Sequence, residues 1–230
     1  MQIKEFLVAK ISGGEWLPGQ IIPSEIQLAQ ELEVSQGTVR KAITELVENN
    51  VLTRKQGRGT FVATHDNQRA LFHFFHIADN KGNKVLPGST TLSCRRRRAS
   101  SIEASMLQLP AGSRIIYIER VRMFNALPTM VEKIVLPSEL FGDLGKAGTH
   151  NLPNNLYELY EKKYGITIHN AEEKLRAVPA SEQNASLLDL QPGTPLLEIE
   201  RVAMTLSRTP VEFRISHCNT DNHHYQNTIF

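Results

Sequence analysis

Two closely spaced helical segments followed by a glycine-rich hairpin occupy residues 24–62 of this 230-residue chain. Ser24 and Ser35 each stand where a serine side chain can cap the start of a helix. The stretches "LTRK" and "GTFV" then predict two short strands, and Gly57 and Gly59 between and beside them allow positive φ and close approach of the backbone. Two helices and a hairpin in this order predict a winged helix-turn-helix.

The second of these helices carries polar and basic residues at its exposed start, where such a helix can enter the major groove of DNA. The net charge of the whole chain is only +2, so an electrostatic argument for nucleic acid has to be local. From residue 35 to residue 62 there are five basic residues and two acidic ones, which fits a polyanion. The alternative is that these are solvated charges on the surface of a small helical domain.

The stretch from Pro18 to Val62 closely resembles the N-terminal signature of GntR-type transcription regulators. This resemblance implies that residues 1–63 bind double-stranded operator DNA at a two-fold site, as a homodimer. The chain departs from the common pattern at Ile26 and at Gln36, where many members carry Arg. Pattern and resemblance together assign DNA binding to Ser24, Ser35, Gln36, Thr38, Arg40, Lys41, Lys55, Gly57, Arg58 and Gly59.

An internal repeat organises the second half of the chain. Residues 104–123 align without gaps to residues 185–204, and ten of the twenty positions are identical. Each copy reads as a short helix, a turn and a β-hairpin, and each is followed by a Val-Glu pair, at 131–132 and 211–212. Chance similarity of two amphipathic units is the alternative. We expect the two hairpins to pair into one antiparallel sheet with helices packed on it, which is an α+β fold.

The repeat also points to a binding site. Arg120 and Arg122 share one face of a predicted strand, but the second copy has Ala203 in place of Arg122. Two guanidinium groups on one face suit an anionic ligand, because each can bind a carboxylate or phosphate with two hydrogen bonds. The alternative is a structural ladder of ion pairs across strands, with Glu132 and Glu212 as partners. Spacing alone does not choose between the two.

Residues 72–230 resemble the effector-binding UTRA domain of the HutC subfamily, through "LPGS", "RVR", "VEK", "LYELYEKKYGI" and "PGTPLLEIERV". The resemblance implies a chorismate-lyase-like fold without lyase activity. It also implies a role in dimerisation and the binding of a small-molecule effector. The two arginines favour an effector that carries a carboxylate or phosphate. The polar residues 64–71 are the predicted linker. The implied effector-binding residues are Ser89, Arg120, Arg122, Glu132, Tyr157 and Glu212.

We therefore predict a ligand-responsive transcription regulator, a repressor as most relatives of this kind are, with no catalytic residues and no cofactor. The alternative is a lyase-like enzyme or a small-molecule-binding module with an accessory DNA-binding domain. The first 62 residues argue against an enzyme, because catalysis has no use for a winged helix.

Other features favour a cytoplasmic protein without a metal. Cys94 and Cys218 show no paired spacing, so we expect free thiols in a reducing compartment. No run of residues reaches the length of a membrane span, and the N-terminus does not have the pattern of a signal peptide. The histidines at 217, 223 and 224 do not have the spacing of a structural zinc site. We interpret the arginine run at 95–98 as a solvated strand end rather than a nucleic-acid patch.

Overall fold

The computed structural model describes residues 2–64, 74–84, 86–146 and 152–227. The chain divides into two compact units, Met1–His65 and Asp66–Phe230. Apart from Thr64, the predicted linker 64–71 lies outside the described residues. Within the described ranges, no helix has both the length and the apolar character that crossing a membrane requires.

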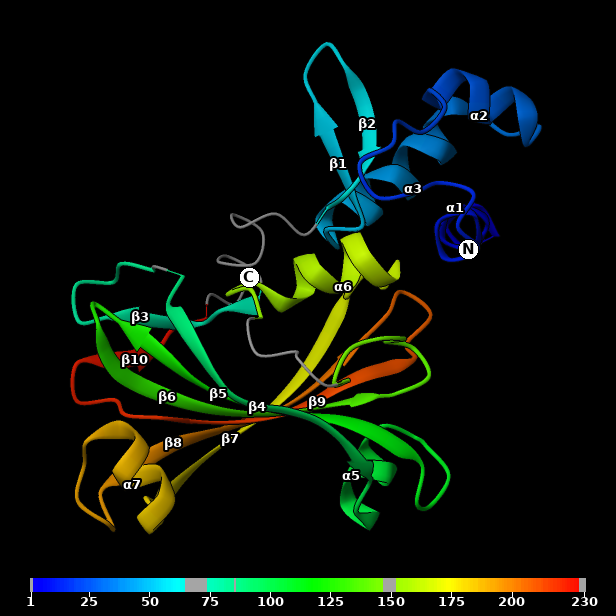
Figure 1. Cartoon of the computed structure of the whole chain (residues 1–230). Coiled ribbons are helices and arrows are strands. Elements are labelled where there is room, and N and C mark those ends of the chain that lie inside the picture. The colour runs from blue at the N-terminus through cyan, green and yellow to red at the C-terminus, as the bar shows by residue number, and fades with distance from the viewer. Residues whose placement is uncertain (1, 65–73, 85, 147–151, 228–230) are drawn as a thin grey trace. The chain divides into compact units, whose positions relative to one another are not determined.

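The first unit is a three-helix domain with a two-stranded wing (Figure 1). The Ser24 hydroxyl accepts a hydrogen bond from the Gln27 amide in a capping box, and the Ser35 hydroxyl accepts one from the Thr38 amide. The two strands pair antiparallel with Leu52 opposite Val62. The predicted winged helix-turn-helix is confirmed, with the elements α1 Gln2–Ser12, α2 Glu25–Glu31, α3 Gln36–Glu48, β1 Leu52–Lys55 and β2 Gly59–Val62.

Helix α3 is amphipathic in the way that the sequence predicts. Its apolar stripe is buried at Val39, Ala42, Ile43 and Leu46, and Val47 beside it is partly buried. The opposite side of its first turns is exposed to solvent. The hydrophobic side holds α3 in the domain, and the polar side is left available for a partner.

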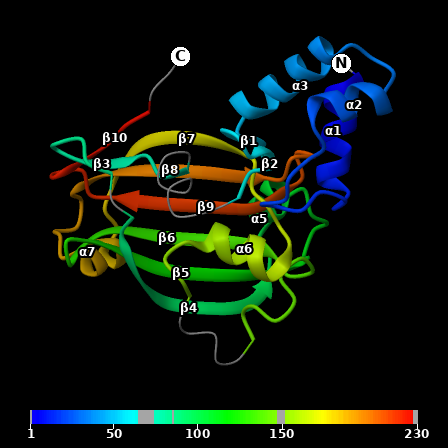
Figure 2. The same ribbon diagram turned by 90° about the horizontal axis from the view of Figure 1, so that it is seen from above.

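The second unit is built on a six-stranded antiparallel sheet with the order β4-β5-β6-β9-β8-β7, which Figure 2 shows from above. A separate pair is formed by β3 and β10. The strands are β3 Ile77–Asp79, β4 Gly88–Arg98, β5 Arg114–Phe124, β6 Leu127–Pro137, β7 Asn170–Pro179, β8 Pro195–Met204, β9 Pro210–Cys218 and β10 His223–Tyr225. The helices are α5 Ser101–Met106, α6 Leu156–Tyr164 and α7 Glu182–Leu188.

The internal repeat is confirmed as a structural repeat. The hairpins β5-β6 and β8-β9 are its two copies, and they join through β6 and β9 at the centre of the sheet. Each hairpin is preceded by a helix and a strand, so the full unit is strand, helix and hairpin. The strand β7 was not predicted from the sequence, because Glu173 interrupts its apolar alternation and most of its residues are exposed at the sheet edge.

One detail of the predicted repeat is wrong. The two Val-Glu pairs are not equivalent in register, because Glu132 lies opposite Arg120 while Glu212 lies opposite Ala203. The loop between Met204 and Pro210 is one residue longer than that between Met123 and Pro128, which shifts β9 relative to β8. Consequently Arg214 occupies in the second copy the place that Glu132 occupies in the first.

Helices cover both faces of the sheet. Figure 1 shows α6 on one face, and α5 and α7 on the other. Under α6, Leu156 and Tyr160 pack on Ile118 and Ile134 in a buried cluster. Helix α6 ends at Gly165, whose φ of 67° is the left-handed cap that the sequence pattern predicts.

Candidate functional site

The predicted DNA-binding residues all lie on the surface of the first unit. Each of the ten is exposed, and they come from the start of α2, the first turns of α3 and the wing. Gly57 and Gly59 have φ of 68° and 105°, the left-handed region that the wing turn requires. The hydroxyls of Ser24 and Ser35 already cap helices, and of the charged residues in the set Arg40 is paired with Glu25.

Three side chains that were not predicted join this surface. The carboxylate of Glu25 accepts a hydrogen bond of 2.8 Å from Nε of Arg40 and one of 3.3 Å from Nη2 of Arg54. The hydroxyl of Thr44 accepts a further hydrogen bond of 3.0 Å from the same nitrogen of Arg54. Sequence spacing gave no signal for these contacts, because they join residues of three different elements.

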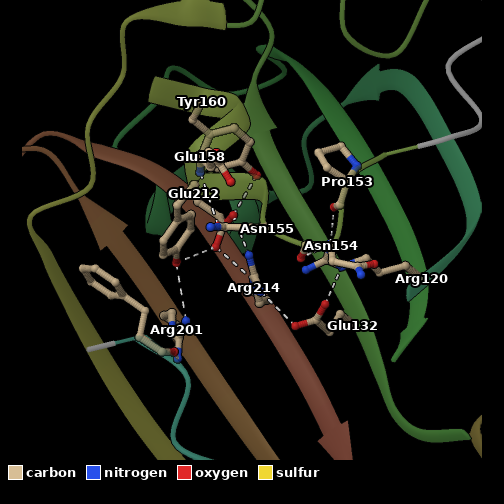
Figure 3. A network of polar contacts seen from close by, with 12 residues as sticks. Arg120, Glu132, Pro153, Asn154, Asn155, Glu158, Tyr160, Arg201, Glu212 and Arg214 are labelled. Carbon is tan, nitrogen blue, oxygen red and sulfur yellow. Dashed lines mark hydrogen bonds and ion pairs between the residues drawn. The ribbon is translucent and has the colours of Figure 1, made fainter. Parts of the chain in front are cut away.

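The second unit holds a network of buried charges on the α6 face of the sheet (Figure 3). Glu212 is fully enclosed, and its carboxylate accepts hydrogen bonds of 2.9 Å from both Nε and Nη2 of Arg214. It also accepts 3.1 Å and 2.8 Å bonds from the hydroxyls of Tyr157 and Tyr160. Burial raises the pKa of Tyr157 to about 12, so its phenol remains a donor at neutral pH. Glu212 is therefore an anchor whose acceptors are already used.

Glu132 is held by two arginines in a similar way. Nε of Arg120 lies 2.5 Å from one carboxylate oxygen, and Nη1 of Arg214 lies 2.8 Å from the other. Burial alone would raise the pKa of Glu132, but Arg120 and Arg214 hold that pKa far below its usual value. Glu132 is thus ionised and paired. The structural ladder that the sequence left open exists between Arg120 and Glu132.

Arg122 does not join that ladder. It lies opposite Met130 in the sheet, and its Nε stays 3.9 Å from the nearest oxygen of Glu132. Its Nη1 donates a 2.7 Å hydrogen bond to the main-chain carbonyl of Asn154, and its Nε has no hydrogen-bond partner among the described residues. The side chain is only 3% exposed, and desolvation lowers the pKa of Arg122 to about 9.

Charge on this face is unbalanced. The network links four arginines to three glutamates, which are Arg120, Arg122, Arg201, Arg214, Glu132, Glu173 and Glu212. Each glutamate has an arginine within hydrogen-bond distance, and Arg122 is the guanidinium left without such a carboxylate. A buried charge without a paired partner is costly, so it marks a place where an anion would be stabilised.

A cavity of about 40 Å³ lies beside Arg122. Four of the six predicted effector residues line it, namely Arg120, Arg122, Glu132 and Tyr157. Ser89 and Glu212 are not among its lining residues. Ser89 is linked to the cavity indirectly, because it donates a 2.9 Å hydrogen bond to the side chain of the lining residue Asn154. The remaining lining residues, not predicted, are Phe74, Phe75, Leu86, Asn154, Asn155, Leu156, Arg201 and Arg214.

The arginines kept in both repeats differ from Arg122 in having a carboxylate within hydrogen-bond distance, Glu132 for Arg120 and Glu173 for Arg201. Nη1 of Arg120 lies 3.4 Å from the carbonyl of Pro153, and Nη2 of Arg201 donates to the carbonyl of Phe74. Each therefore fastens a segment of main chain across the face of the sheet.

The remaining predictions have mixed outcomes. Arg96 and Arg97 are not simply solvated, because Arg96 donates to the carbonyls of Gly142 and Leu144 and Arg97 pairs with Glu103 at 2.6 Å. This corrects part of our interpretation of the arginine run. Cys94 and Cys218 are free thiols, as predicted. His217 lies 3.0 Å from Glu198.

Comparisons with known families match both units. Residues 1–62 match the model of the gntR family of bacterial regulatory proteins, and residues 83–224 match the UTRA domain. The Bacillus subtilis HTH-type transcriptional repressor NagR is 32% identical over 212 residues, which are 92% of this chain and 86% of that protein. The histidine utilization repressor of Klebsiella aerogenes is 30% identical over 206 residues, covering 87% of this chain and 82% of the other.

Solved structures agree with these relatives. The ligand-binding domain of a GntR-family regulator from Bordetella bronchiseptica matches 69% of this chain and 99% of its own, with 35% identity and a TM-score of 0.62. YydK of Bacillus subtilis shares the fold over 100% of this chain and 99% of its own, at 19% identity and a TM-score of 0.62. The chain is a transcription regulator rather than an enzyme, and it belongs to the gntR family as a HutC-type member that carries a UTRA domain.

Proposed function

We propose that this regulator is a repressor, acting in the cytoplasm, that is released from its operator when a small anion binds beside Arg122. The observation that carries the proposal is the buried guanidinium of Arg122, which lines a cavity and lacks a carboxylate within hydrogen-bond distance. An incoming carboxylate or phosphate would supply that missing charge and accept from the unpartnered Nε. The repressors among its relatives support the direction of control.

Because the cavity is small, the site would have to open before an effector could bind. A space of about 40 Å³ holds water molecules but not an organic acid. The carbonyl of Asn154 now accepts from Arg122, so an anion that takes its place would have to displace this segment. Phe75, whose ring lies 5.9 Å from the guanidinium of Arg122, would form an apolar wall beside the ligand.

On the DNA side, we propose that α3 enters the major groove and that Arg58 and the wing glycines approach the backbone. The exposed positions of all ten predicted residues support this assignment. A homodimer would present two such helices to a two-fold site, with half-sites about 34 Å apart. An effector would weaken binding by favouring a different separation of the two DNA-binding units.

The test begins with an electrophoretic shift of the DNA upstream of the gene for this regulator. Acidic metabolites are then screened by thermal shift, because a ligand that binds the folded state raises the melting temperature. A metabolite that stabilises the protein should also reduce the DNA shift. A regulator whose stabilising ligands are all neutral or cationic would contradict the anion site.

A further inference from the structure

Glu25, at the first position of α2, links side chains from two other elements of the DNA-binding unit. One carboxylate oxygen accepts from Arg40 on α3 and the other from Arg54 on β1. Arg54 also donates to the hydroxyl of Thr44, which donates 2.8 Å to the main-chain carbonyl of Arg40. These four residues, the Glu25 ring, close a circuit that joins α2, the recognition helix and the wing.

The exposed fractions of the side chains in the Glu25 ring show which of them are accessible to DNA. The side chain of Glu25 is 21% exposed, whereas those of Arg40 and Arg54 are 60% and 43% exposed. The carboxylate therefore lies beneath two outward-pointing guanidinium groups. Its bond to Arg40 uses Nε, and neither terminal nitrogen of Arg40 has a hydrogen-bond partner among the described residues. That terminal pair is the part of an arginine that can bind both acceptors of a guanine.

We propose that Glu25 is a positioning residue that sets the sequence selectivity of DNA binding without touching DNA. The proposal rests on the DNA contact of Arg40 proposed above. A long side chain loses conformational freedom when it is immobilised at an interface, and the Glu25 ring imposes part of that loss before DNA arrives. The same carboxylate repels phosphates, so it weakens contacts with DNA that do not use the aligned arginines.

The two effects act in opposite directions on two measurable affinities. Glu25→Gln should weaken binding to the preferred duplex, because Arg40 is no longer held, by about three- to tenfold. It should strengthen binding to a shuffled duplex, because a negative charge near the phosphates is gone. The preferred duplex is the one that the parent protein selects from a random-sequence pool. Fluorescence anisotropy at one fixed salt concentration measures both affinities.

Glu31→Gln is the matched control, because Glu31 lies on the same helix, is exposed and falls outside the Glu25 ring. It removes the same charge and should leave the ratio of the two affinities unchanged. Glu25→Asp keeps the charge but is one methylene shorter, so it should weaken binding to the preferred duplex alone. If Glu25→Gln and Glu31→Gln change both affinities in the same proportion, Glu25 is an ordinary surface charge and the proposal is wrong.

A double variant separates this proposal from the one on which it rests. In an Arg40→Ala background, Glu25→Gln should no longer weaken binding to the preferred duplex, because the side chain that it positions is absent. Arg40→Ala without any effect would contradict the proposed DNA contact. If Arg40→Ala weakens binding to the preferred duplex but neither Glu25→Gln nor Glu25→Asp does, the DNA contact of Arg40 is supported and the positioning role of Glu25 is contradicted. Circular dichroism of each variant verifies that the protein is folded.

Discussion

At the scale of single residues, Arg120 and Arg122 differ in their carboxylate partners although they lie two positions apart on β5. Arg120 is paired with Glu132 and holds the segment at Pro153, so its charge is compensated within the protein. Arg122 has no carboxylate at hydrogen-bond distance and is nearly as buried. A buried pair loses stability when one partner is removed, and Arg122, 3.9 Å from Glu132, has a weaker pair to lose than Arg120.

Arg122→Ala should therefore destabilise the fold much less than Arg120→Ala, which should cost about 3–5 kcal/mol. The repeat indicates that alanine is tolerated at position 122, because Ala203 occupies the equivalent place in the second copy. Chemical denaturation of both variants measures the difference. Equal losses of stability would mean that Arg122 is as structural as Arg120.

Arg122→Ala should also abolish release of DNA by the effector while leaving operator affinity near that of the parent protein. A charge-assisted hydrogen bond in a desolvated site contributes about 1.5–3 kcal/mol, so the loss of response should be large. Arg122→Lys should restore the response poorly, because an ammonium group cannot reproduce the planar fork. A normal response from Arg122→Ala would exclude this residue from the effector site.

At the scale of elements, the wing depends on two glycines for different reasons. Both have left-handed φ, but a Cβ at Gly57 would meet open space, whereas one at Gly59 would lie 3.0 Å from Cδ1 of Ile21. At Gly57 only the backbone conformation disfavours a larger residue. At Gly59 both the backbone conformation and contact with the segment before α2 disfavour one.

Gly57→Val should weaken DNA binding in a folded protein, because a β-branched residue disfavours the left-handed region by about 1–2 kcal/mol. Gly57→Asn is the control, since asparagine adopts that region more readily, and it should bind DNA more tightly than the valine variant. Footprinting of the two variants against the parent measures contact of the wing. Identical footprints for valine and parent would argue against a wing that touches DNA.

The elements also show what the sequence could and could not predict. Capping serines, glycine turns and alternating apolar residues are local signals, so the winged domain and the four repeat strands follow from the sequence. Strand β7 is mostly exposed at the sheet edge, and a glutamate interrupts its apolar alternation, so its local pattern is weak. The partners in the charge network come together only in the folded sheet, as with Arg214 and Glu132, which are 82 positions apart. For that reason the two roles of Arg120 and Arg122 could not be separated from spacing alone.

At the scale of the whole molecule, release of DNA by an effector would require a coupling between the two compact units. Each unit has its own hydrophobic core and its own candidate site. If the protein is a homodimer, as its resemblance to HutC-type regulators implies, sedimentation of the full chain at micromolar concentration should give twice the monomer mass. A monomer at that concentration, in the absence of DNA, would mean that the operator itself brings two copies together.

The most direct test of the effector site is the coupling free energy between anion and operator. Linkage requires that the anion weaken operator binding by the same factor by which the operator weakens anion binding. Titrations of the parent protein should give one common factor of about 5–150, and Arg122→Ala should bring that factor to one while its operator affinity stays normal. A factor that survives in Arg122→Ala, or a parent protein whose operator affinity no acidic ligand changes, would contradict the assignment of the effector site to Arg122.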